Sequence, residues 1–250
     1  MGERTLVNII GGFLGVGKTT AINHLLQQRP AHEKWAVVVN EFGDIGIDGS
    51  LLRGAASLDD DVPLGNDVSL GAGSSVGGAA PTPKGAVLHE IPGGCICCTA
   101  GFAFQDAVVR LLRRERPHRL LIEPTGIATL RSIIDTLRQP GLAEAVELRT
   151  ILTLVDPAHW VSARHRTNET YRDQIEAADV LLANRGDLSE SGATEQFLRD
   201  AGELFPPKRH VAVVAYGQVD VALLDKVRDS PSEVPAENGA VSHGDGQVHA

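Results

Sequence analysis

With 250 residues, of which 42% are hydrophobic and 22% are charged, the chain has the size and composition of a globular protein with one large α/β domain, or one domain with an appendage. Its formal net charge of −9, without any run of Lys or Arg, argues against nucleic acid or an anionic membrane surface as the main partner. The chain has no apolar stretch of roughly 20 residues and no signal-peptide pattern, and its three cysteines are confined to residues 95–98, which together predict a cytoplasmic protein.

A glycine-rich loop between a strand and a helix is the first motif along the chain. The apolar run Thr5–Ile10 predicts a buried strand, and Thr19–Gln28 repeats apolar residues on one helical face. The intervening residues 12–19 read GFLGVGKT and match the phosphate-loop pattern G-x-x-x-x-G-K-[ST]. This pattern alone has false positives, so its position between a strand and a helix is what favours a nucleotide site.

Each residue type in this loop suits a bound nucleoside triphosphate. Gly12, Gly15 and Gly17 allow successive backbone N–H groups to point at the β-phosphate. Lys18 adds a positive charge for the β and γ oxygens, and the Thr19 hydroxyl is a candidate ligand of Mg²⁺. The alternative, a glycine-rich turn that merely closes a β–α unit, leaves Lys18 and Thr19 without a role.

The next segment combines a strand, an acidic loop and a stretch of low complexity. The run Trp35–Val39 predicts a second buried strand, and a polar, glycine-bearing loop that carries Glu41 follows it. A carboxylate there either senses Mg²⁺ or a transition metal, or is an ordinary solvated charge. Residues from about 54 to 84 are rich in Gly, Ala, Ser, Asp and Pro and contain no aromatic residue, so we expect a flexible insertion.

A cluster of three cysteines follows the strand expected at Ala86–Ile91. Cys95, Cys97 and Cys98 lie in a loop flanked by glycines, a spacing that lets three thiolates converge on one soft ion such as Zn²⁺ or Cu⁺. Three sulfurs leave a fourth coordination position for water, a partner or another side chain, as a transfer site requires. Alternatively, the three cysteines are small apolar residues buried in the core, or two of them form a redox pair and the third is left over.

The rest of the chain alternates between strand and helix patterns. The apolar strand Arg119–Ile122 ends at Glu123 of the sequence EPTG, where GTPases place an acidic-x-x-Gly switch. Glu123 is therefore a candidate for contact with Mg²⁺ or its waters, with a solvated charge as the alternative. The alternation predicts a mainly parallel sheet with helices on both faces and ligands at the carboxyl ends of the strands. Further strands are expected at Thr150–Val155, Asp179–Ala183 and His210–Ala215, and helices at Phe102–Arg114, Thr129–Arg138, Asn168–Ala177, Ala193–Leu204 and Val219–Arg228.

The sequence Asn184-Arg185-Gly186-Asp187 matches the N-[KR]-x-D base reader of GTPases and follows a predicted strand. A carboxylate at Asp187 accepts from both guanine N1–H and N2–H₂, whereas adenine offers no such pair of donors. The alternative is an Asx turn that caps a helix beginning near Ser189. Residues 229–250 are polar and contain Pro and Gly, so they are predicted to be a disordered tail after a domain at 1–228.

The ordered set GGFLGVGKTT, NEFGDIGID, GGCICCTAG, IEPTGIA, VDPAHW and ADVLLANRGDL resembles the CobW-type metal-trafficking P-loop GTPases. The resemblance spans about residues 5–226 and implies a P-loop NTPase fold. It implies that Gly12 to Thr20 hold the phosphates, that Glu123 and Glu41 are switch carboxylates, and that Asn184 with Asp187 reads the base. It also implies that Cys95, Cys97 and Cys98 hold a metal ion.

The resemblance further implies a GTPase that binds GTP, Mg²⁺ and Zn²⁺, with Co²⁺ or Ni²⁺ as alternatives, and that releases metal to a client metalloprotein on hydrolysis. No arginine finger is identifiable, which predicts slow intrinsic turnover that metal or the client accelerates. The chain differs from the family in Arg185, where lysine is usual, and in the long stretch at 54–84. We also expect it to lack the family's usual C-terminal domain. Two other functions stay open: a metal sensor or buffer with nucleotide as a static ligand, and an ATP-dependent kinase.

Overall fold

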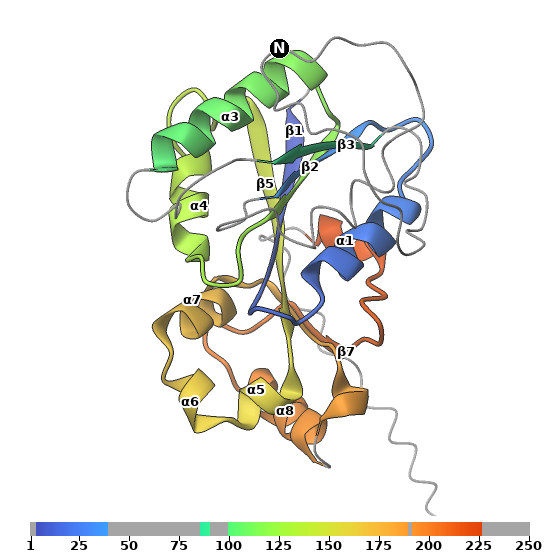
Figure 1. Ribbon diagram of the computed structural model, residues 1–250, viewed down its shortest axis with the longest axis vertical. Coiled ribbons are helices and arrows are strands. Elements are labelled where there is room, and N and C mark those ends of the chain that lie inside the picture. The colour runs from blue at the N-terminus through green and yellow to red at the C-terminus, as the bar shows by residue number, and fades with distance from the viewer. Residues whose placement is uncertain (1–3, 40–85, 91–99, 190–191, 227–250) are drawn as a thin grey trace, which may run out of the picture.

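The computed structural model describes residues 4–39, 86–90, 100–189 and 192–226 (Figure 1). Within these ranges the chain forms a seven-stranded sheet in the order β3-β2-β4-β1-β5-β6-β7, in which every pair of neighbours is parallel. This confirms the predicted parallel α/β sheet and all seven expected strands. The strands are β1 (Thr5–Gly12), β2 (Trp35–Val39), β3 (Ala86–Glu90), β4 (Arg119–Glu123), β5 (Val146–Val155), β6 (Val180–Ala183) and β7 (His210–Val213).

The predicted helices form, with one exception. The segment expected as a helix at Val219–Arg228 contains only a short 3₁₀ turn, and Val227 and Arg228 lie outside the described residues. The helical prediction is wrong there because side chains of the sheet take the backbone oxygens: Asn8 donates to the Leu224 oxygen and Thr150 to the Lys226 oxygen. The helices are α1 (Lys18–Gln27), α3 (Ala100–Glu115), α4 (Leu130–Leu137), α5 (Pro157–Val161), α6 (Ala163–Arg166), α7 (Glu169–Ala177) and α8 (Ala193–Gly202), with 3₁₀ turns η1 (Gly186–Leu188) and η2 (Val221–Asp225).

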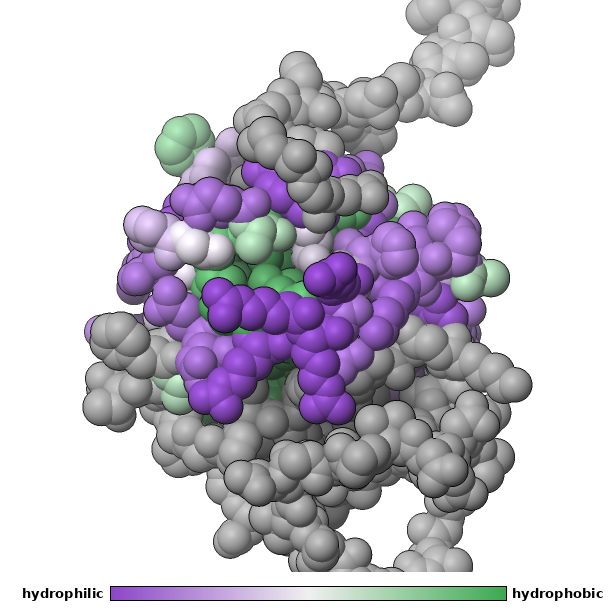
Figure 2. All heavy atoms as spheres, turned by 90° about the horizontal axis from the view of Figure 1, so that it is seen from above, coloured by the Kyte–Doolittle hydropathy of each residue, from purple (hydrophilic) through white to green (hydrophobic). Residues whose placement is uncertain are grey.

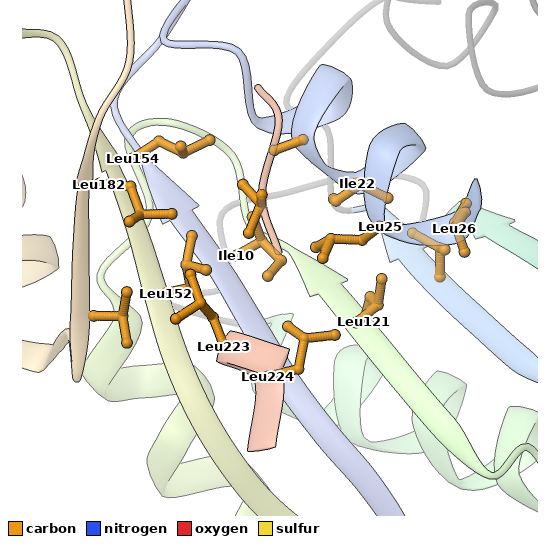
Figure 3. Packing of buried hydrophobic residues seen from close by; sticks show 14 of the residues in the cluster. Ile10, Ile22, Leu25, Leu26, Leu121, Leu152, Leu154, Leu182, Leu223 and Leu224 are labelled. Atoms are coloured by element: carbon orange, nitrogen blue, oxygen red, sulfur yellow. The ribbon is translucent and has the colours of Figure 1, made fainter. Parts of the chain in front are cut away.

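The sheet is covered on both faces, which explains why its strands are continuous apolar runs rather than alternating ones. On one face, α3 and α4 pack against alternate residues of β1, β2 and β4, and Figure 1 shows these two helices on the side opposite α1. On the other face, Ile22, Leu25 and Leu26 of α1 point at the sheet. Figure 3 shows Leu25 of α1 near Ile10 and Leu121 of the sheet, with Leu223 and Leu224 of η2 lower in the view and in the same buried cluster.

The order of the strands places the predicted motifs at one edge. Strand β1 lies between β4 and β5, and β6 is the next neighbour. In a parallel sheet all carboxyl ends meet at the same edge. The phosphate loop after β1, Glu123 at the end of β4, and Asn184 directly after β6 are therefore gathered there.

A buried polar network joins the middle of the sheet to the last described segment. The Arg119 side chain, on a residue only 3% exposed, donates to Asn8 Oδ1 at 2.5 Å and to the two carboxylate oxygens of Asp225 at 2.8 and 2.9 Å. Its guanidinium carbon also lies 5.2 Å from the centre of the Trp35 ring. These bonds fix η2 against β1 and β4, on the face that also carries α1.

The described surface is mostly hydrophilic on the face shown in Figure 2, around a smaller group of hydrophobic residues. Among the described helices, none has the length and hydropathy needed to cross a bilayer. The predicted insertion at 54–84 and the predicted tail at 229–250 lie outside the described residues.

Candidate nucleotide site

The phosphate loop connects β1 to α1 through glycines that no other residue replaces easily. Gly12 has φ +142°, and a Cβ there would lie 2.7 Å from Val16 Cγ1 and 2.8 Å from the Leu154 oxygen. Gly17 has φ +99°, and a Cβ there would lie 2.7 Å from Asn184 Nδ2. Gly17 precedes α1 without a side-chain cap, so the first backbone N–H groups of the helix are directed at the loop, as in an anion site.

A hydroxyl and a carboxylate meet beside this loop. Thr19, in the first turn of α1, donates its hydroxyl to Glu123 Oε1 at 2.8 Å, and Glu123 is only 6% exposed at the end of β4. Lys18, the first residue of α1, is 8% exposed. Hydroxyl and carboxylate oxygens are ligands that Mg²⁺ prefers, so the donor set at Thr19 and Glu123 fits this ion or its coordinated waters. The structure thus places the three predicted catalytic residues, Lys18, Thr19 and Glu123, beside the phosphate loop.

The segment after Glu123 lies directly on the phosphate loop. A Cβ at Gly126 would lie 2.5 Å from the Leu14 nitrogen and 2.9 Å from its Cα. Contacts as short as these are not found for real Cβ atoms, so glycine is required for this close approach. The acidic-x-x-Gly segment therefore reaches the phosphate loop through its glycine as well as through Glu123.

The predicted base reader is tied to the same loop. Asn184, 3% exposed, donates to the Val16 oxygen at 2.8 Å and accepts from the Gly217 N–H at 3.1 Å. Arg185 donates to the Gly15 oxygen at 2.9 Å. Arg185, at the position where lysine is usual, thus binds the backbone of the phosphate loop. This hydrogen bond uses only one of the N–H donors of the guanidinium.

Asp187 lies in η1 with an exposed side chain, where a base could reach it. The alternative interpretation as an Asx turn that caps a helix from about Ser189 is wrong. Helix α8 begins at Ala193, and the residue before it, Gly192, makes no side-chain cap. Thr20, predicted with the phosphate loop, is exposed on α1.

Sequence reasoning missed the loop after β7 as part of the site. Gly217 has φ +68°, and a Cβ there would lie 2.9 Å from the Ala21 nitrogen of α1. Its N–H group is the one that holds Asn184, so this loop helps to position the base reader. The available signal was a glycine shortly after the last strand, which is a weak signal in any α/β protein.

A cluster of aromatic rings and histidines also touches the phosphate loop, and spacing gave no reason to expect it. His159 and His165 are stacked, with ring centres 4.0 Å apart and an interplanar angle of 18°. Phe13 of the loop meets both histidines and Tyr171 edge-on at 5.5–6.0 Å. Burial, and then the charge of Asp156, raise the pKa of Tyr171, so this phenol stays neutral.

His165 makes stability depend on pH. Burial first, then the neighbouring His159 and Arg164, lower the pKa of His165 below its usual 6.5, although Asp156 acts in the opposite sense. Below about pH 6.5 the unfolded chain takes up a proton that native His165 does not, so stability falls until the native pKa is reached. We expect the melting temperature of the native protein to decline more steeply between pH 7 and 5 (about the range of histidine titration) than that of His165→Phe.

Burial and the charge of Lys226 also lower the pKa of His210, but His210 is present in both proteins. The comparison of the native protein with His165→Phe therefore isolates the effect of His165. His32→Gln, at a surface histidine whose side chain is 83% exposed, serves as the control and should follow the native curve. Parallel melting curves for the native protein and His165→Phe over this range would contradict the prediction.

The predicted metal ligands Glu41, Cys95, Cys97 and Cys98 lie outside the described residues. Among the residues that are described, no group of three or more His, Cys, Asp or Glu side chains is arranged to hold a metal ion.

Comparison with known proteins gives relatives that are longer than this chain. The Zinc chaperone YeiR of Escherichia coli is 39% identical over 239 residues, which cover 96% of this chain and 63% of YeiR. The Zinc chaperone CobW of Sinorhizobium sp is 28% identical over 241 residues, which cover 86% of this chain and 60% of that protein. The chain therefore spans less than two thirds of the length of these curated relatives.

The fold is similar to that of the Zn(II)-bound YjiA GTPase from E. coli, with a TM-score of 0.59 and 25% identity. The similarity covers 90% of this chain and 61% of the YjiA chain, and it confirms the predicted P-loop NTPase class. Residues 6–212, from the first strand to the last, match the family described as CobW/HypB/UreG, nucleotide-binding domain. The chain belongs to the CobW/HypB/UreG family, through its nucleotide-binding domain.

Proposed function

We propose that this chain is a GTP-hydrolysing metallochaperone that binds zinc, or cobalt or nickel in its place, and couples hydrolysis to transfer of the metal to a client metalloprotein. The observation that carries the proposal is the contact of Thr19 with Glu123 beside the phosphate loop, in a chain of the CobW/HypB/UreG family. This contact supports a site built for a nucleoside triphosphate with its cation rather than for a phosphate alone.

In the proposed mechanism the chain supplies positioning and charge. Lys18 and the backbone N–H groups at the start of α1 stabilise negative charge on the phosphoryl group as it is transferred to water. Thr19 and Glu123 would hold Mg²⁺, directly or through its waters. Mg²⁺, when bound, would neutralise charge on the β and γ oxygens. Gly126, in contact with Leu14, brings the segment after Glu123 to the phosphate loop.

Guanine is the proposed base. Asn184 is buried and holds the loops after β1 and β7, while Asp187 is exposed at the same edge and offers a carboxylate to the base. Guanine N1–H and N2–H₂ would satisfy both oxygens of that carboxylate, whereas adenine would leave it without these donors.

The transported ion is proposed to bind Cys95, Cys97 and Cys98, with Glu41 as a further candidate ligand. Thiolates select zinc and other soft or borderline ions. The names of YeiR and CobW, both zinc chaperones, support zinc as the first candidate.

Phosphate release from GTP in the presence of Mg²⁺ tests the proposal, with ATP as competitor. We expect slow production of GDP. Excess ATP should leave the rate unchanged, and removal of Mg²⁺ by a chelator should stop the reaction. No phosphate above the protein-free blank, with GTP bound, would instead identify a sensor or buffer that holds nucleotide as a static ligand. Inhibition by ATP at concentrations equal to GTP would favour the kinase function.

A further inference from the structure

Helix α7 holds the segment that follows Glu123, although it belongs to neither predicted switch. Gln174 is 1% exposed, and its Nε2 donates to the backbone oxygens of Gly126 and Ala128, each at 3.1 Å. A carboxamide nitrogen has two donor hydrogens, so these two bonds use both of them. The same side chain thus binds the backbone on both sides of Ile127.

The orientation of this carboxamide follows from its neighbours. Both partners are carbonyl oxygens, which only the nitrogen end of the side chain can satisfy. The other end, Gln174 Oε1, is buried and has no hydrogen-bond partner among the residues that the structure describes. A buried acceptor without a partner is unfavourable. The two hydrogen bonds donated by Gln174 Nε2 therefore matter more at this position than the packing of the side chain.

Helix α7 is itself fixed to the sheet and to the phosphate loop, by one contact each. Thr153 of β5 donates its hydroxyl to the Gln174 backbone oxygen at 3.1 Å. One turn earlier on α7, the Tyr171 ring meets Phe13 of the phosphate loop edge-on at 6.0 Å. Gln174 therefore holds the segment after Glu123 from a support that also touches the phosphate loop.

A second side chain of α7 anchors the far end of this segment. Asp173 Oδ2 accepts from the Leu130 N–H at 2.6 Å, at the start of α4, and Asp173 Oδ1 lies 3.1 Å from Arg131 Nε. The backbone from Gly126 to Leu130 is thus held at three points by two neighbouring residues of α7.

The bonds from Gln174 also determine what the segment presents to a phosphate. A carbonyl oxygen directed at a phosphate would repel it, and the bonds to Gln174 keep the oxygens of Gly126 and Ala128 directed at α7. Gly126 lies against the Leu14 nitrogen of the phosphate loop, and the same segment begins at Glu123, which contacts Thr19. Phosphates bound by that loop would therefore have this segment as a neighbour.

We propose that Gln174 is a positioning residue: through the Gly126 and Ala128 carbonyls it holds the segment after Glu123 in the arrangement that recognises the γ-phosphate, without touching the nucleotide. The proposal rests on the proposed function of this chain as a GTPase. Helix α7 would then determine, through Gln174, how strongly the site prefers a nucleoside triphosphate to a diphosphate.

Gln174→Met tests this, since methionine keeps the length of the side chain and removes both donors. We expect the affinity for a non-hydrolysable GTP analogue with Mg²⁺ and the kcat for GTP each to fall about tenfold or more, with the affinity for GDP changed by less than about threefold. Thr150→Val is the matched control: it removes one buried hydrogen bond of the sheet, to the Lys226 oxygen, far from the phosphate loop. Its ratio of analogue affinity to GDP affinity should equal that of the native protein.

An unchanged ratio in Gln174→Met, or equal losses for both nucleotides, would overturn the inference and leave Gln174 a structural residue. If Gln174→Met does not fold, Asp173→Asn weakens the anchor at Leu130 instead, and it should lower the same ratio. Failure of the native protein to bind GTP or to hydrolyse it would contradict the proposed function itself, and the native measurement is made first for that reason.

Discussion

Replacement of Lys18 by alanine is expected to lower the rate of GTP hydrolysis by roughly two to three orders of magnitude. Lys18 begins α1 at the end of the phosphate loop and is 8% exposed, so its charge acts close to the phosphates with little screening by water. Phosphate release under single-turnover conditions, with GTP affinity determined separately, distinguishes a loss of chemistry from a loss of binding.

Lys34→Ala is the control for Lys18→Ala. The Lys34 side chain is 38% exposed, and its ammonium pairs with Glu115 at 2.8 Å near the amino ends of the strands, so its removal should leave hydrolysis unchanged. A Lys18→Ala protein that hydrolyses GTP at the native rate would show that the phosphate loop does not carry the reaction.

Replacement of Asp225 by asparagine is expected to reduce the free energy of unfolding by about 2 kcal/mol, because it leaves the buried Arg119 guanidinium without its carboxylate. The value is smaller than for a fully buried pair because the Asp225 side chain is 47% exposed. Denaturant unfolding measures it, and a fall in melting temperature of about 4–8 °C should accompany it.

Asp106→Asn is the matched control for Asp225→Asn. Asp106 pairs with Arg110 one helical turn away on α3, and both side chains are more than half exposed, so no measurable change in stability is expected. Equal stabilities for Asp225→Asn and the native protein would mean that the network around Arg119 does not hold η2 on the sheet.

The strand positions were predictable because a parallel sheet buried on both faces requires apolar runs, and runs such as Trp35–Val39 have no other good explanation. The phosphate loop was predictable because the conformation of Gly12 and Gly17 restricts those positions to glycine. Thr19 and Glu123 are 104 residues apart, and their meeting followed from the rule that motifs at the carboxyl ends of parallel strands gather at one edge.

Other features depend on partners distant in the sequence that no local pattern reveals. The apolar residues Val219, Leu223 and Leu224 have helical spacing, yet the segment is a short 3₁₀ turn because Asn8 binds the Leu224 oxygen. Gln174 resembles any polar residue of an amphipathic helix until the structure brings Gly126, 48 residues earlier, to its side chain. The ring neighbours of His159 are equally distant from any local pattern: Phe13 lies in the loop after β1, and His165 lies on α6.

In the proposed function the nucleotide state controls the metal site, so zinc affinity should differ between two nucleotide states. A chelator competition would be run on the full chain with Mg²⁺ and a non-hydrolysable GTP analogue, and again with Mg²⁺ and GDP. We expect zinc to bind at least about tenfold more tightly in the triphosphate state, and this difference to be lost in Cys97→Ala. Equal zinc affinity in the two states would contradict the coupling and leave a metal-binding protein whose nucleotide does not control its cargo.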